Sequence, residues 1–443
     1  MCSGLKSARE KRFYAVTLLL IMFFRGANYI GLEYPVMFSD SEDYISLEWD
    51  YLRTHFVTNT GQPPLYPLLI AICRVFGTHY LNVVVGIQML LSLSALFAFA
   101  YVLRMLELKL HLRMVLLLFY GASPAICGWD GCILTESLSL SGTVWFVFFI
   151  MRYIKAGEAK NGIASIIITL LLTFLRPQFL YVFAALLFFF VLKSFFEETN
   201  GRTNLKMVFL MLAGVMVILA YCNNFKSSYG IFSLSDALPR QNLFTCMERG
   251  YYKEFENKNL TKMLEPYVED GKAEWNGALL AVKEFGSAEI SRQTRQFFQK
   301  KPVRYLKDTI DVIAEDMSSD FYGYDYGAKA RDSVPGIVYK IIALQKALFG
   351  KVSVGWALLA SSLEGIAMTY VWLTKKRPPW VHMALFSISV CTTWLTYFVT
   401  CGEYMRTMVS VLPYFYIMIG LFIQWACNES LPESERNKNY DLR

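Results

Sequence analysis

The chain has 443 residues, of which 55% are hydrophobic and 18% are charged, and its formal net charge is +7. A soluble domain carries about 25% charged residues, and its apolar residues do not form runs long enough to cross a hydrocarbon core of about 30 Å. Such runs recur along nearly the whole chain, which excludes a soluble domain. The basic residues cluster between these runs, so we interpret them as topology signals and not as a nucleic-acid-binding surface.

The first apolar run predicts an uncleaved membrane span at about residues 13–32. Four basic residues lie within the first twelve positions and place the N-terminus in the cytoplasm. No small-residue cleavage site follows the run, so it is not a removable signal peptide. Residues 33–80 then form a first exoplasmic loop, which is acidic and aromatic. It closes with Pro63-Pro64 and a short apolar stretch that we interpret as an interfacial or re-entrant helix.

The apolar run at about 162–192 decides the count of crossings. Arg176-Pro177 lies near its middle, and an arginine at the centre of a bilayer costs about 2.5–3.5 kcal/mol. Two spans that meet at Arg176 remove this cost, because the arginine then lies at the exoplasmic surface. The split also keeps the later basic loops in the cytoplasm.

The other predicted spans follow the same reasoning. Spans are expected at about 81–103, as a pair within 113–152, and at about 206–222, 352–373, 380–400 and 407–427. The predicted fold class is an all-α polytopic membrane protein with about ten transmembrane helices, a mostly helical exoplasmic domain and both termini in the cytoplasm. The predicted organisation is an N-terminal transmembrane module over 1–222, an exoplasmic or periplasmic domain over 223–335, C-terminal transmembrane helices over 336–427 and a cytoplasmic tail over 428–443.

This topology gathers charged residues from four loops at the exoplasmic face. The first loop supplies Asp40, Glu42 and Asp43, and the others supply Asp130 with Glu136, Arg176, and Glu403 with Arg406. Arginine is disfavoured on that face, and both arginines adjoin apolar spans where an unpaired charge is costly. Each therefore needs a counter-charge, which is either a loop carboxylate or an anionic ligand such as a phosphate.

Other chemistries find little support in the sequence. There is no phosphate-binding loop, no dinucleotide fingerprint, no nucleophile elbow and no HExxH motif. The four histidines are scattered, so no histidine metal site is expected. The acidic cluster at Asp40–Asp43 could bind a divalent cation through oxygen ligands, and no other cofactor is predicted.

Five short motifs in order resemble those of a known superfamily. They are D-S-x-x-Y at Asp40–Tyr44, P-P-L-Y-P-L-L at Pro63–Leu69, T-E-x-L at Thr135–Leu138, L-R-P-Q at Leu175–Gln178 and E-Y-x-R at Glu403–Arg406. Together they resemble the GT-C superfamily of integral membrane glycosyltransferases, and within it the bacterial group related to protein mannosyltransferases and the lipid A aminoarabinose transferase. The resemblance covers the spans and the first loop, but not residues 223–335.

The resemblance implies a site as well as a fold. In that superfamily a first-loop aspartate lies at the catalytic centre, and the donor is a sugar on a polyprenyl phosphate. Asp40 is the matching residue, with Asp43 as the second catalytic candidate. Many relatives have an arginine where this chain has Gln62, which shifts the expected phosphate contacts to Arg176 and Arg406. The candidate substrate-binding residues are Tyr44, Tyr66, Glu136, Arg176, Gln178, Glu403 and Arg406.

The expected activity is transfer of a sugar from a polyprenyl-phosphate donor to a cell-envelope acceptor at the exoplasmic face of the inner or plasma membrane. The acceptor could be lipopolysaccharide, another polysaccharide or a protein. Nucleotide sugars are cytoplasmic, and the chain has no sizeable cytoplasmic domain to bind them, which favours a donor that crosses the bilayer with its lipid carrier. The alternatives are a transferase of the O-antigen ligase or polymerase kind and a non-enzymatic transporter or lipid flippase. The scarcity of ionisable residues within the spans argues against a transporter.

Overall fold

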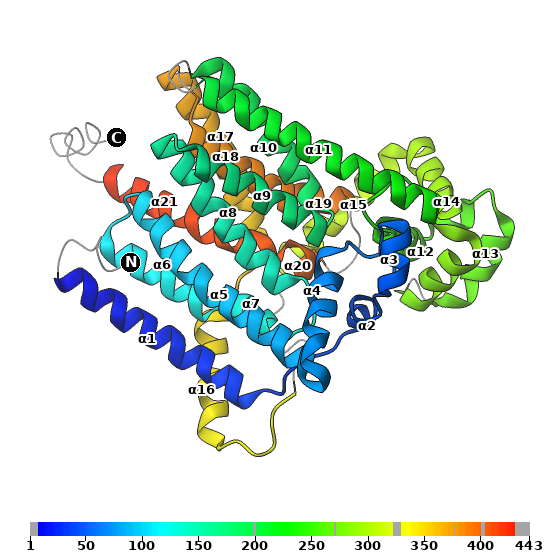
Figure 1. Cartoon of the computed structure of the whole chain (residues 1–443), viewed down its shortest axis with the longest axis horizontal. Coiled ribbons are helices and arrows are strands. Elements are labelled where there is room, and N and C mark those ends of the chain that lie inside the picture. The colour runs from blue at the N-terminus through cyan, green and yellow to red at the C-terminus, as the bar shows by residue number, and fades with distance from the viewer. Residues whose placement is uncertain are drawn as a thin grey trace.

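The computed structural model describes residues 8–197, 201–269, 272–321, 329–376, 378–399 and 404–429. Long apolar helices lie side by side in one bundle, and a group of mostly shorter helices projects from one end of it (Figure 1). The N-terminal end of the first helix and the C-terminal end of the last lie at the opposite end of the bundle (Figure 1). The bundle helices are α1 (Ala8–Gly31), α5 (Tyr80–Met105), α6 (Leu110–Ala122), α8 (Glu136–Ala156), α9 (Ala159–Leu175), α10 (Phe179–Phe196), α11 (Gly201–Tyr229), α17 (Val354–Lys375), α18 (Trp380–Thr392) and α21 (Leu412–Glu429).

Within the described part of the chain, eight helical segments are long and apolar enough to cross a membrane. A ninth crossing is reached if α6 and the segment Pro124–Gly131, which meet at a bend of 46°, form one span. Helix α9 is apolar but has only 17 residues. The predicted count of about ten therefore requires both the bent pair and the short α9 to cross.

The apolar run over 162–192 divides where the sequence predicts. Helix α9 ends at Leu175, Arg176 takes an extended conformation with φ −145° and ψ 124°, and α10 begins at Phe179. Proline disfavours the helical conformation of the residue before it, so Pro177 explains why the helix stops there. Arg176 consequently lies at the junction of two helices and not in the middle of one.

The first loop is fastened to the segment that precedes α8. Backbone hydrogen bonds join Val36 N to Gly131 O (2.9 Å) and Ile133 N to Val36 O (2.9 Å), and the Ser41 hydroxyl donates to Ile133 O (2.8 Å). These contacts hold the loop beside the start of α8. The short elements at this end of the bundle are α2 (Ser39–Ile45), α3 (Trp49–His55), α4 (Leu65–Cys73), η2 (Arg74–His79), α7 (Pro124–Cys127), η3 (Gly128–Gly131), α19 (Trp394–Val399), α20 (Tyr404–Thr407) and η6 (Met408–Val411).

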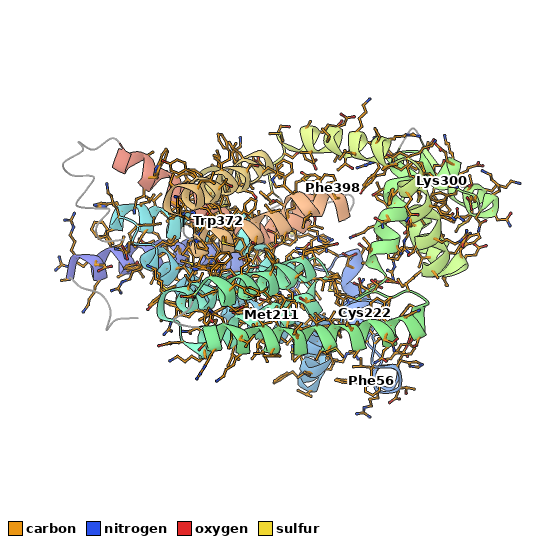
Figure 2. All side chains as sticks on the ribbon, turned by 90° about the horizontal axis from the view of Figure 1, so that it is seen from above. Phe56, Met211, Cys222, Lys300, Trp372 and Phe398 are labelled. Atoms are coloured by element: carbon orange, nitrogen blue, oxygen red, sulfur yellow. The ribbon has the colours of Figure 1, made fainter. Side chains whose placement is uncertain are left out.

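The projecting group of helices, which we call the subdomain, has a hydrophobic core of its own, formed by residues such as Leu243, Tyr251 and Phe297. Figure 2 shows Lys300 on the subdomain and Trp372 toward the other end of the bundle. A two-residue antiparallel pair, β1 (Val268–Glu269) with β2 (Lys272–Ala273), is its only strand pairing among the described residues. The remaining elements of the subdomain are α12 (Ala237–Glu248), η4 (Tyr251–Glu254), α13 (Lys258–Leu264), η5 (Glu265–Tyr267), α14 (Trp275–Lys300) and α15 (Pro302–Asp316).

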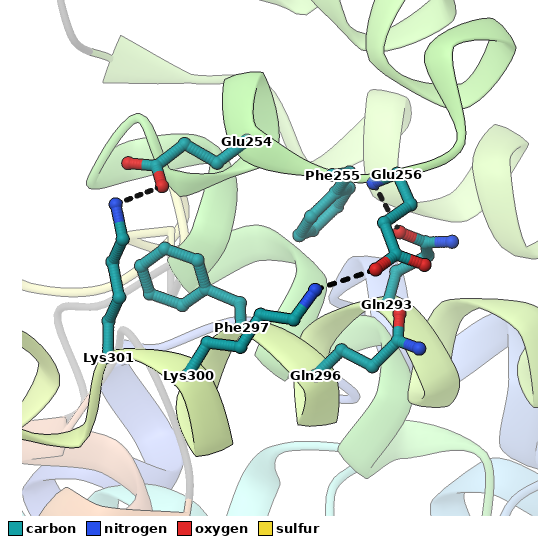
Figure 3. Close-up of a pocket in the computed structure, with 8 residues that line it drawn as sticks. All are labelled: Glu254, Phe255, Glu256, Gln293, Gln296, Phe297, Lys300 and Lys301. Carbon is teal, nitrogen blue, oxygen red and sulfur yellow. Dashed lines mark hydrogen bonds and ion pairs between the residues drawn. The ribbon is translucent and has the colours of Figure 1, made fainter.

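Ion pairs tie the end of η4 and the loop after it to the C-terminal end of α14 (Figure 3). The Lys300 ammonium lies 2.6 Å from the Glu256 carboxylate, and Lys301 pairs with Glu254. The cavity between these side chains measures only about 40 Å³. All four charges are engaged with each other, so we interpret this cluster as a structural contact of the subdomain.

The N-cap of α13 offers a test of local stability. The Asn257 side-chain oxygen accepts a hydrogen bond from Leu260 N at 3.1 Å. Loss of such a cap costs about 1 kcal/mol, so Asn257→Ala is expected to speed hydrogen exchange of the α13 amides by about five-fold. Asn259→Ala is the matched control, because Asn259 is exposed and makes no cap, and it should leave exchange unchanged. Equal rates in the two variants would contradict the capping role.

Two helices differ from the sequence-based boundaries. Helix α11 continues to Tyr229, past the predicted end at 222, so the last turns of the helix project with the subdomain. Helix α16 (Gly336–Phe349) was not predicted and packs along α1. Gln345 of α16 accepts from the Asn28 amide (2.6 Å) and donates to Ala122 O (2.7 Å), so these buried polar groups fix α16 to the bundle.

Candidate functional site

Four charged side chains meet where the first loop touches the helix bundle. The Arg406 guanidinium donates from Nη2 to Asp40 Oδ2 at 2.8 Å and from Nε to Glu136 Oε1 at 2.6 Å. Arg176 Nη1 lies 3.6 Å from the same oxygen of Glu136. We call Asp40, Glu136, Arg176 and Arg406 the charged cluster.

Each member of the charged cluster comes from a different part of the chain. Asp40 lies in the first turn of α2, and Glu136 is the first residue of α8. Arg176 caps the C-terminal end of α9, and Arg406 lies on α20. All four positions are helix ends or short loop helices, so the charged groups lie at the end of the bundle and not along its length.

Exposure differs sharply within the charged cluster. The side chain of Glu136 is 0% exposed, and those of Arg406 and Arg176 are 10% and 12% exposed, whereas that of Asp40 is 32% exposed. Among the described residues, Arg176 Nη1 and Glu136 Oε2 are buried without a hydrogen-bond partner. A buried guanidinium nitrogen that lacks an acceptor is costly, and an anion placed beside it would remove that cost.

Two tyrosines support the charged cluster from the first loop. Tyr44 is buried and packs edge-on against Tyr66, with ring centroids 5.1 Å apart. Burial raises the pKa of the Tyr44 hydroxyl, and the carboxylates of Asp40 and Glu136 raise that pKa further, so the group stays a neutral donor. Tyr66 is fully buried and donates from its hydroxyl to Gln88 Oε1 at 2.7 Å.

A second set of charges joins the first loop to the subdomain. Arg240 donates from Nη1 to Asp43 Oδ2 (3.3 Å), and from Nη2 to Asp236 Oδ2 (2.5 Å) and Thr60 O (3.3 Å). The Gln62 amide also donates to Asp43, at 3.0 Å. Burial raises the pKa of Asp236, and the Arg240 charge opposes that rise. Asp43 thus faces the subdomain, whereas Asp40, one helical turn earlier, faces the bundle.

Comparison with solved structures identifies the architecture. No protein-family model matches the sequence, and no curated protein matches it. The archaeal oligosaccharyltransferase AglB from Archaeoglobus fulgidus, in complex with an inhibitory peptide and a dolichol-phosphate, matches with a TM-score of 0.50 and 12% identity over 95% of this chain and 51% of that chain. The chain has a GT-C fold.

The apo crystal structure of the Archaeoglobus fulgidus oligosaccharyltransferase is similar as well, with a TM-score of 0.49 and 10% identity over 99% of this chain and 53% of that chain. The chain spans about half the length of these solved structures. The likeness concerns the fold. The fold shared with the AglB complex is the fold that the resemblance of the five sequence motifs implied, while the bacterial subgroup stays a prediction.

The GT-C fold brings most of the candidate residues together. Asp40, Glu136, Arg176 and Arg406 meet in the charged cluster, with Tyr44 buried beside them. Gln178 lies next to α20, which carries Arg406, because the Gln178 amide donates to Thr407 O at 3.1 Å. Asp43 pairs with Arg240, Tyr66 packs against Tyr44, and Glu403 lies outside the described residues.

No group of three acidic, histidine or cysteine side chains in the described ranges is arranged to hold a metal ion. The acidic cluster of the first loop, which the sequence offered as a cation site, is divided instead. Asp40 is paired with Arg406 and Asp43 with Arg240. Glu42 is exposed on the opposite side of the short helix α2 from the buried Ser41 and Tyr44.

Sequence reasoning missed a buried ion pair beside this site. Arg25, in α1, is 0% exposed and lies 3.3 Å from the carboxylate of Asp130, which is 1% exposed. The Ser137 hydroxyl donates to the other oxygen of Asp130 at 2.6 Å, and Ser137 directly follows Glu136. An arginine inside an apolar run was the available signal, because such a charge requires a buried partner.

Proposed function

We propose that this chain is a membrane glycosyltransferase that moves a sugar from a polyprenyl-phosphate donor to a cell-envelope acceptor. The observation that carries the proposal is the charged cluster. In it a partly exposed carboxylate, Asp40, contacts the nearly buried Arg406, and the buried Glu136 links Arg406 to a second nearly buried guanidinium group, Arg176. The acceptor classes are lipopolysaccharide, another polysaccharide and protein. This pairing of a carboxylate with two arginines suits a reaction in which an acceptor hydroxyl loses a proton and a phosphate leaves.

Asp40 is the proposed general base. Its carboxylate accepts the proton of the acceptor hydroxyl as that oxygen attacks the anomeric carbon of the donor sugar. The bond from the anomeric carbon to the phosphate oxygen breaks, and its electron pair leaves with the lipid phosphate. Attack from the side opposite the phosphate inverts the anomeric configuration. Asp40 suits this task because it is the most exposed member of the charged cluster.

Arg176 and Arg406 are the proposed phosphate contacts. Negative charge grows on the phosphate as it leaves, and guanidinium groups placed in advance stabilise that charge. Arg406 is held by both carboxylates of the charged cluster, which fixes its orientation. Arg176 Nη1 has no hydrogen-bond partner among the described residues, so it has capacity for a phosphate oxygen. Glu136 would then keep the two arginines in place.

The placement in the membrane is part of the proposal. AglB was solved with a dolichol-phosphate and an inhibitory peptide, which supports a lipid-linked donor for a chain of the same fold. Basic loops, and the start of α1 and the end of α21 at the same end of the bundle, favour both termini in the cytoplasm of a cell with an inner or plasma membrane. The charged cluster and the subdomain would then face the exoplasmic side.

Replacement of Arg176 tests this function. Loss of one charge-assisted hydrogen bond costs about 1.5–3 kcal/mol, so Arg176→Ala is expected to lower kcat/KM for the lipid-linked donor by about 10- to 100-fold. Transfer of radiolabelled sugar from polyprenyl phosphate to endogenous acceptors in membrane vesicles provides the measurement. Arg202→Ala, an exposed arginine at the start of α11, is the control and should leave transfer unchanged.

The amount of folded protein separates the functional role from a structural one. If Arg176→Ala lowers folded protein as much as it lowers transfer, Arg176 is only a structural partner of Glu136. If wild-type vesicles transfer no sugar from any polyprenyl-phosphate donor, the proposed function is wrong.

A further inference from the structure

A cavity of about 410 Å³ lies between the end of α11, the start of α12 and the middle of α14. Its volume falls within the range of about 300–1,000 Å³ that is common for binding sites of small organic ligands. Its polar lining residues are Ser228 and Tyr229 from α11, Asp236 and Arg240 from α12 and its N-cap, and Lys283 and Ser287 from α14.

The cavity contains buried polar groups with unused hydrogen-bonding capacity. The side chain of Asp236 is 5% exposed, and that of Arg240 is 14% exposed. Asp236 Oδ1 and Arg240 Nε have no hydrogen-bond partner among the residues that the structure describes. Buried carboxylate and guanidinium atoms are nearly always satisfied. These two atoms are closed to solvent in the structure, so a polar ligand would have to turn the Asp236–Arg240 pair toward the cavity to use them.

The rest of the lining is adapted to a sugar. Leu279 and Val282 add apolar surface from α14, and Tyr229, whose ring stacks on Phe225 with centroids 4.4 Å apart, adds aromatic surface. Helix α14 is broken at Gly286, where φ is +79° and no atom lies within 4 Å of the place that a Cβ would take. The cavity therefore combines carboxylate, guanidinium and hydroxyl groups with apolar and aromatic surface, as a sugar with polar edges and apolar faces requires.

Helix α2 connects this cavity to the charged cluster. Arg240, which lines the cavity, pairs with Asp43, and Asp40 pairs with Arg406. Asp40 and Asp43 are three residues apart on one helix, and residues at that spacing are neighbours on its surface. A ligand held in the cavity would thus be connected to the proposed general base through Arg240, Asp43 and one turn of α2.

We propose that this cavity binds a sugar unit of the acceptor, which makes the acceptor a glycan. This inference rests on the proposed function, and it narrows the three acceptor classes to a carbohydrate. An isoprenoid chain in the cavity would bury the charges of Asp236 and Arg240 against hydrocarbon without satisfying them. The donor lipid therefore belongs between the apolar helices, and the cavity belongs to the acceptor.

Cysteine protection tests the proposal on the full-length protein in lipid nanodiscs. Ser228→Cys places a thiol in the cavity lining, and Ser227→Cys places one on the adjacent exposed residue, which does not line the cavity. Labelling with a membrane-impermeant maleimide is followed at both positions, after subtraction of labelling of the unsubstituted protein. The probe is the polysaccharide fraction of the source cell envelope, used intact and after periodate oxidation, which cleaves vicinal diols of sugars.

At a glycan concentration of about four times Kd, labelling of the Ser228→Cys variant should slow by about five-fold. Labelling of the control variant, Ser227→Cys, should not slow. Periodate oxidation of the glycan should abolish this protection. Absence of protection at saturating glycan, equal protection at both positions, or protection that survives periodate oxidation would each overturn the proposal. The assay involves no transfer, so its failure is distinct from failure of the glycosyltransferase activity.

Discussion

Replacement of Asp40 by asparagine is expected to lower sugar transfer by about 10²- to 10⁴-fold, the usual contribution of a general base. Asparagine keeps the size of the side chain and can still accept a hydrogen bond from Arg406, but it has no affinity for a proton. Because the Asp40 side chain is 32% exposed, the amount of folded protein should stay close to that of the unsubstituted chain. Transfer from labelled lipid-linked sugar in membrane vesicles, normalised to folded protein, measures the effect.

Two neighbouring carboxylates on α2 serve as controls. Glu42→Gln changes an exposed residue outside the charged cluster and should retain full transfer. Asp43→Asn removes the negative charge that pairs with Arg240, and it should weaken the attachment of the first loop to the subdomain without removing the proposed base, Asp40. Full transfer by Asp40→Asn would show that the base assignment is wrong, and a loss confined to Asp43→Asn would move the assignment to Asp43.

The sequence predicted those features of the fold that depend on the cost of burying charge. Arg176 and Pro177 indicated a break in a long apolar run, and the structure places the junction of α9 and α10 there. The same argument placed Asp40, Glu136 and Arg406 on one membrane face, because each lies beside the end of an apolar run. Their convergence within hydrogen-bonding distance was a weaker expectation, since a shared face does not determine which side chains meet.

The contacts that the sequence did not predict join residues far apart in the chain. Arg25 and Asp130 are separated by 105 positions, and Asp43 and Arg240 by 197 positions. No periodic pattern links such pairs, and only the packing of helices brings them together. Helix α16 was missed for a different reason. It is 14 residues long, too short to read as a span, and its attachment to α1 depends on the buried Gln345.

The second large effect is expected on stability, from removal of Asp130. Asp130→Ala would leave the Arg25 guanidinium, which is 0% exposed, without its counter-charge, and loss of one partner of a buried ion pair costs about 3–5 kcal/mol. Tyr29 and Ser137 would also lose the carboxylate that accepts their hydrogen bonds. Thermal unfolding of the purified protein in nanodiscs measures the loss. Asp50→Ala, at an exposed carboxylate of α3, is the control and should change stability by less than about 0.5 kcal/mol.

The double variant Arg25→Met with Asp130→Ala separates the cost of an unpaired charge from the value of the pair. Apolar replacement of both partners of a buried pair is often neutral, so the double variant should recover most of the stability that Asp130→Ala loses. A double variant as unstable as Asp130→Ala would show that the unpaired charge of Arg25 is not the cause of the loss.

The transfer activity of the double variant carries separate information, because the Ser137 hydroxyl donates to Asp130 and Ser137 directly follows Glu136. If stability returns while transfer stays low, the buried pair positions Glu136 and, through it, both arginines. If both return together, the pair holds α1 to the segment before α8 and has no further part in the site.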